Sequence, residues 1–192
     1  SMAPLVTADF VGLDVHKAIV DNVYQNTNDY AHDTFVLPAF AQKLVDEKKL
    51  GRKTNGGLYQ LIKYENGLKR QTVLDLNTGA YRDKIPYAFP FADKMKKYIA
   101  EGDYAKAFER LVNNHSQEAE ICLSFLLKYI VYSLYATKEV GYSVHDADDV
   151  MATGFNWCPP LAMYQARSTV ADVKTLVKER LVEICQKVDV DR

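Results

Sequence analysis

The sequence predicts a mainly α-helical chain with two helical halves. A small β-hairpin and a linker rich in proline and aromatic residues lie between them. Apolar residues recur at helical spacing in both halves of the chain. Residues 58–75 are rich in Tyr, Ile, Leu and Val around Asn66-Gly67, a strong hairpin signal. Pro86 and Pro90 stand among aromatic residues, a composition that marks a boundary between the helical halves.

Length, charge and cysteine usage limit the class of protein. A chain of 192 residues with 48% hydrophobic residues can bury a sizeable core in one domain or two small ones. A formal net charge of −1 predicts no binding to nucleic acid or to an anionic membrane. Cys122, Cys158 and Cys185 lack metal-ligand spacing, so we expect reduced thiols in a cytoplasmic protein. A basic and then apolar leader is absent, so no secretion signal is expected.

The first half should contain two helices. Apolar spacing predicts one helix over residues ~5–25, and Gly12 inside it suggests close packing against a neighbour. Pro38 suits the first turn of the second helix. The basic pair Lys48-Lys49 and then Gly51 should end that helix.

The residues Leu50–Tyr59 are the stretch around which the chain is organised. Gly51, Gly56 and Gly57 favour backbone conformations with φ > 0. We therefore predict that Gly57→Val destabilises the fold by about 1–3 kcal/mol. A phosphate-binding loop is the alternative to a simple connector, but it needs Gly-Lys-Ser/Thr between a strand and a helix, and this order is absent.

The hairpin signal allows a pairing register to be predicted. A two-residue turn at Asn66-Gly67 would place Tyr59 opposite Leu74 and Lys63 opposite Arg70. Because like charges directly opposite each other are unfavourable, either that end is solvated or a longer loop shifts the pairing.

The second half should be a run of helices. The first spans about Ala92 to Glu101 and stops at Gly102. Asp103 and Ser116 should cap the next two helices. The last helix should start at a capping box formed by Thr169 and Asp172.

Residues ~117–138 form the most hydrophobic element. A membrane span is the alternative, but Lys128 near the centre would cost about 3 kcal/mol in a bilayer. A helix that is apolar all round in a soluble chain is buried on all sides. We therefore expect no membrane span, but a central helix that a partner subunit partly covers.

Acidic and histidine residues give no metal or catalytic signature. Asp146, Asp148 and Asp149 lack the glycine and glutamate positions of a calcium-binding loop, so they predict the acidic first turn of a helix that Gly154 ends. The histidines at 16, 32, 115 and 145 show no metal-ligand spacing and no carboxylate partner that could be placed beside them. His145 and Asp146 are only neighbours in sequence.

Several blocks of the chain resemble the C-terminal domain of the 3-hydroxyacyl-CoA dehydrogenases. Residues 50–59 are similar to the family's Leu-Gly-Arg-Lys-Thr-Gly-x-Gly-Phe-Tyr signature, with Asn55 and Leu58 as mild departures. Three further stretches are similar to blocks of the same family: residues 4–14, residues 74–82 and residues 139–161. The motif residues that carry the resemblance are Gly51, Lys53, Gly57, Tyr59, Gly154 and Pro160, and they are expected to be structural.

The resemblance implies an architecture of two tandem helical units. Residues 1–60 would be the latter part of a first unit, residues 61–91 the hairpin and linker, and residues 92–192 a second, shortened unit. Because Ser1-Met2 precede a chain that starts inside a motif, we expect a piece of a longer enzyme that is inactive alone. A hydratase-like domain can follow in long bacterial members of the family.

The resemblance also implies a function in fatty-acid β-oxidation. The family oxidises 3-hydroxyacyl-CoA with NAD, and its catalytic His and Glu lie in a nucleotide-binding domain. We therefore expect no catalytic, cofactor-binding or metal-binding residue here, and NAD only in the parent enzyme. The helical region would form a homodimer and close over the acyl-CoA substrate. The alternatives are an independent helical binding module with no catalytic parent and a self-sufficient enzyme with an unrecognised site.

Overall fold

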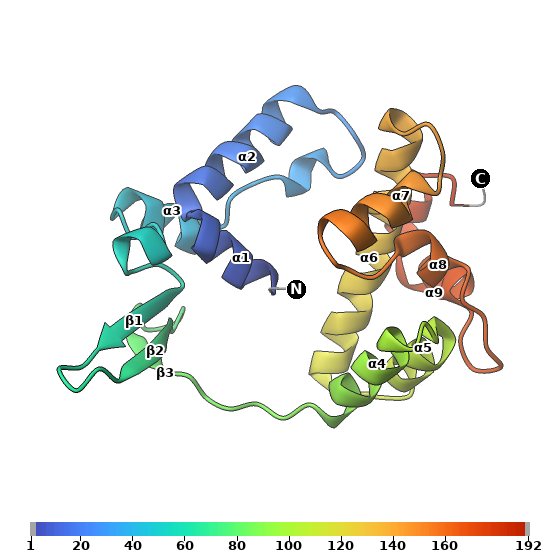
Figure 1. Cartoon of the computed structure of the whole chain (residues 1–192). Coiled ribbons are helices and arrows are strands. Elements are labelled where there is room, and N and C mark those ends of the chain that lie inside the picture. Colours follow the sequence, from blue (N-terminus) through green and yellow to red (C-terminus); the bar gives the residue numbers. More distant parts are fainter. Residues whose placement is uncertain (1–2, 191–192) are drawn as a thin grey trace. The chain divides into compact units, whose positions relative to one another are not determined.

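The structure is a computed structural model that describes residues 3–190. The residues Ser1 and Met2, on which the expectation of a cut-out piece partly depends, lie outside the described part. The chain divides into two compact units, one ending at Tyr87 and the other beginning at Ala88 (Figure 1). Most of the regular elements are helices, and the strands form a small sheet. The prediction of a mainly α-helical chain is therefore confirmed.

The first unit combines short helices with a three-stranded antiparallel sheet of order β1-β2-β3 (Figure 1). Its elements are α1 (Pro4–Val11), α2 (Leu13–Asn26), η1 (His32–Thr34), α3 (Ala39–Asp46), η2 (Arg52–Thr54), β1 (Tyr59–Lys63), β2 (Lys69–Leu74) and β3 (Tyr81–Asp83).

Gly12 divides the helix that was predicted over residues ~5–25. It takes φ 118°, separates α1 from α2 and lets the chain change direction. The prediction of one continuous helix is wrong because apolar spacing continues across a break that only this backbone angle reveals. Close packing at Gly12 is confirmed, since a Cβ atom there would lie 2.7 Å from the Lys53 Nζ.

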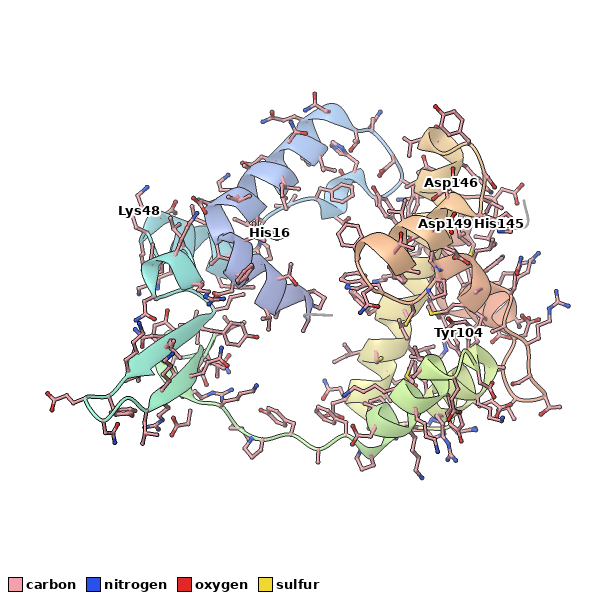
Figure 2. All side chains as sticks on the ribbon, viewed as in Figure 1. His16, Lys48, Tyr104, His145, Asp146 and Asp149 are labelled. Carbon is pink, nitrogen blue, oxygen red and sulfur yellow. The ribbon has the colours of Figure 1, made fainter. Side chains whose placement is uncertain are left out.

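Lys48, not Gly51, ends the second helix. Lys48 takes the left-handed conformation with φ 60°, after α3 has ended at Asp46 (its side chain is labelled in Figure 2). The Lys49 N–H donates to the Leu44 carbonyl at 2.8 Å, which closes the helix end. The prediction that Gly51 stops this helix is therefore wrong. Gly51 instead pairs with Gly56 in the turn that follows.

The hairpin register differs from the prediction by one residue on β2. Tyr59 pairs with Val73 and Lys63 pairs with Lys69, so the connection spans residues 64–68. Within this connection the Gly67 N–H donates to the Tyr64 carbonyl at 3.0 Å. The two-residue turn is thus wrong, and the longer loop that was the open alternative is what forms.

The third strand was not predicted as a strand. In β3, Tyr81 pairs with Leu74 of β2. The Tyr81 hydroxyl donates to the Gly57 carbonyl at 2.8 Å, and Arg82 forms an ion pair with Asp75 at 3.0 Å. Long-range pairing of this kind stabilises a three-residue strand that is too short for a periodic signal.

The second unit is helical in the part that the structure describes. Its elements are α4 (Pro90–Ala100), α5 (Tyr104–Val112), α6 (Gln117–Val140), α7 (Asp146–Asp149), the π-helical turn η3 (Val150–Gly154), α8 (Pro160–Tyr164), α9 (Val173–Arg180) and α10 (Val182–Cys185).

Local signals predicted most of these helix ends. Asp103 and Ser116 cap α5 and α6, with side-chain oxygens that accept from the Lys106 and Ala119 N–H groups. Gly102 takes φ 74° after α4, as expected for a helix stop. The capping box at Thr169 is wrong, because Asp172 itself is the N-cap of α9 and accepts from the Lys174 N–H.

The long helix α6 is only partly buried. One side carries the fully buried Leu123, Leu127 and Ile130, whereas Ile121 and Phe125 are 63% and 52% exposed. Within the chain alone α6 is therefore not buried on all sides, and its cover by a partner subunit stays a prediction. By length and composition α6 could cross a membrane, and a core helix of a soluble protein can meet the same test, so one such helix is weak evidence.

Candidate functional site

The glycine-rich turn of residues 51–57 closes on itself. The Gly51 N–H donates to the Gly56 carbonyl at 2.8 Å, and the Gly56 N–H donates back to Gly51 at 3.2 Å. Gly51 takes φ 101°, and a Cβ atom there would overlap with the Asp9 carbonyl oxygen. Asn55 takes the left-handed conformation with φ 52°, which an asparagine tolerates better than most residues. The same angle suits glycine, which stands at this position in the motif that residues 50–59 resemble.

Asp9 connects α1 to this turn. Its side chain is only 5% exposed, and its Oδ1 atom accepts from the Leu58 N–H at 2.6 Å and the Tyr59 N–H at 3.3 Å. Burial raises the pKa of the Asp9 carboxyl, and the two backbone hydrogen bonds partly oppose this rise. One buried carboxylate thus holds α1 against the start of β1.

Gly57 is required for space and not for a positive φ. It is not among the glycines that take a positive φ in the described structure. A Cβ atom there would lie 2.5 Å from the Gly51 Cα and 2.6 Å from the Gly51 nitrogen. The premise of left-handed backbone at Gly57 is therefore wrong. A side chain would instead force apart the two backbone segments that the turn brings together.

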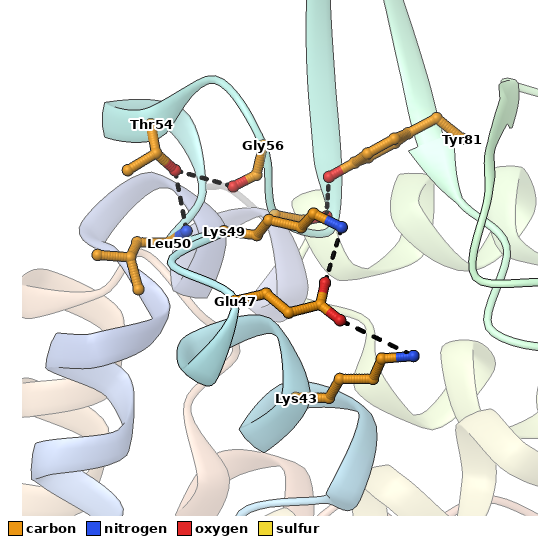
Figure 3. Close-up of polar contacts among 8 residues, drawn as sticks. Lys43, Glu47, Lys49, Leu50, Thr54, Gly56 and Tyr81 are labelled. Atoms are coloured by element: carbon orange, nitrogen blue, oxygen red, sulfur yellow. Dashed lines mark hydrogen bonds and ion pairs between the residues drawn. The ribbon is translucent and has the colours of Figure 1, made fainter.

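Polar contacts fasten the turn to its neighbours, as Figure 3 shows. The Leu50 N–H donates to the Thr54 hydroxyl at 2.9 Å, and this hydroxyl donates to the Gly56 carbonyl at 3.0 Å. Lys49 forms an ion pair with Glu47 at 2.7 Å. The Thr54 hydroxyl therefore bonds within the turn, and Lys49, which precedes the motif, pairs with the end of α3.

Lys53 joins the turn to α2. Its Nζ atom lies 2.5 Å from Asp14 Oδ1, and this hydrogen bond holds the pKa of the Asp14 carboxyl below its usual value. Because both side chains are about 41% exposed, solvent screens the pair.

An open groove of about 910 Å³ lies between α1 and the hairpin. The groove is lined in part by Val6, Asp9 and Phe10 of α1, by Arg52 and Asn55 of the turn, and by Tyr59, Leu61, Lys63, Lys69 and Gln71 of the hairpin. Tyr59, the last residue of the motif, is half-buried at its edge. The motif therefore forms part of a concave surface, which is the usual shape of a ligand site.

The second unit uses a carboxylate in a similar way. Asp148 accepts from the Leu161 N–H at 2.6 Å and from the Ala162 N–H at 3.1 Å. These donors lie in the first turn of α8, where Pro160 is buried at the first helical position. Gly154 ends the π-helical turn, but a Cβ atom there would meet nothing within 4 Å.

The acidic residues near α7 have structural partners. Asp146 Oδ2 accepts from the Tyr142 and Ser143 N–H groups at 2.8 and 3.0 Å. Within residues 3–190, no group of three or more His, Cys, Asp or Glu side chains could hold a metal ion. These contacts give the acidic cluster a role in local folding.

The described histidines lie in separate segments, and none belongs to a group of described residues that could hold a metal ion. His16 lies on α2 of the first unit, and His145 lies beside Asp146 at the start of α7 in the second (Figure 2). The His32 ring stacks on Tyr24 at 4.3 Å, and its Nδ1 atom lies 2.7 Å from the Thr27 carbonyl. That ring therefore stabilises a loop.

The cysteines are free thiols in the structure. Burial raises the pKa values of the Cys122 and Cys158 thiols. A raised pKa lowers the thiolate fraction, so neither has the character of a nucleophile. The Cys158 carbonyl accepts from the Tyr129 hydroxyl at 2.7 Å, which gives that tyrosine a packing role.

Comparison with known proteins identifies the first part of the chain. Residues 1–61 match the family of the 3-hydroxyacyl-CoA dehydrogenase C-terminal domain. The matched residues include α1, the glycine turn with its Asp9 contact and the first three residues of β1, whereas β2 lies outside the match.

Curated relatives extend the similarity beyond this part. The chain is 26% identical over 153 residues to a Rickettsia felis protein named as a fatty acid oxidation complex trifunctional enzyme. It is 24% identical over 163 residues to a Bacillus subtilis protein named as a 3-hydroxyacyl-CoA dehydrogenase. These alignments cover 78% and 83% of this chain. They are longer than the first unit, so they reach into the second.

The chain spans about a fifth of the length of these curated relatives, since the aligned part covers 19% of each. No solved structure matches the chain.

Sequence reasoning missed two features of the first unit. Asp9 was part of a recognised block, but its contact lies 49 residues away along the chain at Leu58. The groove was missed because three separate segments form it. The like-charge pair at Lys63 was the one local sign, although its partner is Lys69 and not Arg70.

Proposed function

We propose that this chain is the helical C-terminal region of an NAD-dependent 3-hydroxyacyl-CoA dehydrogenase that acts in fatty-acid β-oxidation. The observation that supports this most strongly is the family match of residues 1–61, which include the glycine turn and the buried Asp9 that contacts the residue after it. The names of the two relatives, which include a dehydrogenase and a fatty acid oxidation complex, support the same pathway.

In this proposal the chain supplies closure over the acyl-CoA and not the chemistry of hydride transfer. Transfer needs a nicotinamide held against the substrate with a base within hydrogen-bond reach. The pyrophosphate of NAD normally rests at a glycine turn between a parallel strand and a helix. In the described residues the strands are antiparallel, and Gly67 lies in a loop that leads from one strand to the next. The NAD-binding and catalytic groups would therefore belong to another part of the parent enzyme, which we expect in the cytoplasm.

The second unit is proposed as a shortened tandem copy of the first. Its support is the shared device of an aspartate that accepts from two successive backbone N–H groups, Asp9 in one unit and Asp148 in the other. The length of the alignments with both relatives is consistent with this arrangement.

Activity is the direct test of this proposal. We expect calorimetric titration of NAD into the purified chain to show no binding in the micromolar range. We also expect no oxidation of a 3-hydroxyacyl-CoA in a spectrophotometric assay. Micromolar NAD binding or measurable turnover would contradict the proposal and would favour a self-sufficient enzyme.

Dimer formation is the second part of the proposal. The exposed Ile121 and Phe125 on α6 would be covered by a second copy of the chain. Sedimentation at micromolar concentration should show a dimer that Phe125→Asp weakens. The control Lys138→Gln changes an exposed residue of the same helix that, at 3.6 residues per turn, lies off the stripe of Ile121 and Phe125, and it should leave the dimer intact. A monomer throughout would rule the dimer out.

A further inference from the structure

The groove of the first unit carries more positive charge than its own carboxylate balances. Arg52, Lys63 and Lys69 line it, and Asp9 is the acidic side chain among its lining residues. Asp9 directs its Oδ1 atom to backbone N–H groups. Among the residues that the structure describes, none of the three cations forms an ion pair with a carboxylate.

The hairpin places two of these cations directly opposite each other. Lys63 of β1 pairs with Lys69 of β2, so both side chains leave the same face of the sheet. Such a like-charge pair is destabilising by itself. The other face of the same strand is different, because Arg70 forms an ion pair with Asp83 of β3. Arg70 is therefore neutralised by a carboxylate of the same sheet, whereas no described carboxylate neutralises Lys63 or Lys69 in the groove.

The third cation is held in place by an aromatic ring. The Arg52 guanidinium lies over the Phe10 ring, 5.1 Å from its centroid. This contact restricts the side chain and leaves its N–H groups free to donate. An ordered guanidinium is well suited to bidentate contacts with phosphate oxygens.

Apolar surface lies beside the cations. Phe10 is 49% exposed and Leu61 is 37% exposed, and both line the groove together with Val6. The volume of about 910 Å³ lies at the upper end of the range for small-molecule sites. The groove therefore offers an anionic ligand both charge and an apolar wall.

We propose that this groove binds a multiply phosphorylated ligand with an apolar arm, the chemical class to which coenzyme A thioesters belong. Lys63, Lys69 and Arg52 would contact the phosphates, and Val6, Phe10 and Leu61 would contact the arm. The ligand class follows from the groove, whereas the choice of coenzyme A as its source rests on the proposed function.

The test is calorimetric titration of the full chain with coenzyme A, an acyl-CoA, ADP, NAD and inorganic phosphate. We expect acyl-CoA to bind most tightly and inorganic phosphate least, with affinity falling as salt is added. NAD should bind more weakly than coenzyme A, because its nicotinamide is cationic and it lacks the ribose phosphate.

Variants locate the binding. Lys69→Gln and Arg52→Gln should each raise the Kd for coenzyme A about tenfold, the scale for loss of one charged hydrogen bond. Lys84→Gln is the matched control, since Lys84 is an exposed cation of the same unit that does not line the groove. Lys69→Gln should also raise the melting temperature, because it removes the repulsion with Lys63. A residue with a purely structural role would not show weaker binding together with higher stability.

Three results would overturn the inference. They are no binding of coenzyme A, binding of inorganic phosphate as tight as that of coenzyme A, and a loss of affinity in Lys84→Gln as large as that in Lys69→Gln. The proposed function fails by different readouts, namely micromolar NAD affinity or turnover. If ADP and coenzyme A bind with equal affinity, and Lys69→Gln and Arg52→Gln weaken the binding of both, the groove recognises the diphosphate. That result would overturn the proposed contact with the apolar arm.

Discussion

Fully buried apolar side chains are few in the first unit and numerous in the second. In the part of the chain that the structure describes, Leu13, Ala41 and Leu44 are the buried apolar residues before Tyr87. After Ala88 the buried apolar set runs from Met95 to Leu181. The first unit instead buries a carboxylate, Asp9, and a turn of three glycines whose backbone atoms almost touch.

The two units are therefore stabilised in different ways. In the second unit, the helices pack through the buried apolar residues between Met95 and Leu181. The stability of this unit should therefore depend mainly on the apolar area that is removed from water. In the first unit, the geometry of one turn and one buried acid keeps α1 against β1. The addition of even one methyl group in that turn should therefore lower the free energy of unfolding of the first unit. Trp157, the single tryptophan, lies in the second unit and reports on it separately.

The largest loss of stability is expected among the buried apolar residues of the second unit. Leu127→Ala removes a side chain that is 0% exposed and should lower the free energy of unfolding by about 2–5 kcal/mol. Urea unfolding followed by Trp157 fluorescence measures this loss. Ile121→Ala, on the same helix but 63% exposed, is the control and should lose much less. Equal losses would mean that the exposed side of α6 is covered.

The next effect compares two adjacent glycines. Gly57→Ala should destabilise the first unit by about 1–3 kcal/mol, because its Cβ would overlap with the Gly51 backbone. Gly56→Ala should cost little, since its Cβ would lie 3.4 Å from the Tyr81 hydroxyl. Urea unfolding followed by far-ultraviolet circular dichroism measures both, and Trp157 fluorescence should stay unchanged. If the two variants unfold alike, the close approach at Gly57 does not determine stability.

A third effect appears as pH dependence. Burial raises the pKa of Asp9 in the folded state, so its contribution to stability is present below the unfolded pKa and is lost as pH rises through the folded pKa. Asp9→Asn keeps an oxygen acceptor without this loss. Its stability relative to the parent should therefore increase as pH rises from below about 4. A constant difference at every pH would contradict a raised pKa.

The smallest effect concerns the exposed ion pair of Lys53 and Asp14. Its sign is opposite, because the pKa of Asp14 is lowered in the folded state. The stabilisation is present above the unfolded pKa and is lost as pH falls through the folded pKa. Asp14→Asn should therefore unfold at a lower urea concentration than the parent at neutral pH, with a difference that vanishes in acid. A difference that persists in acid would mean that Asp14 acts through something other than its charge.

Features that depend on near neighbours in sequence were largely predictable. The caps at Asp103 and Ser116, the stop at Gly102 and the existence of the hairpin all follow from a few adjacent residues. The break at Gly12 and the left-handed Lys48 were missed, because the same residues are also compatible with other backbone angles.

Features that depend on distant residues could not be predicted. The reason for Gly57 lies in its contact with Gly51 and Asp9, and nothing near it in sequence distinguishes crowding from a positive φ. The hairpin register was wrong because the loop is longer than its Asn66-Gly67 signal suggests. The groove needs α1, the turn and the hairpin to meet, which only the tertiary structure shows.

The Asp9 carboxylate holds α1 against the start of β1, and so joins two walls of the groove. Hydrogen exchange of individual amides tests it most directly, in the parent and in Asp9→Ala. We expect the Leu58 and Tyr59 amides to be protected in the parent and to lose at least about tenfold of that protection in the variant, because each loses a buried acceptor. The Leu161 and Ala162 amides, which donate to Asp148, should not change. Unchanged protection at Leu58 and Tyr59 would contradict the claim.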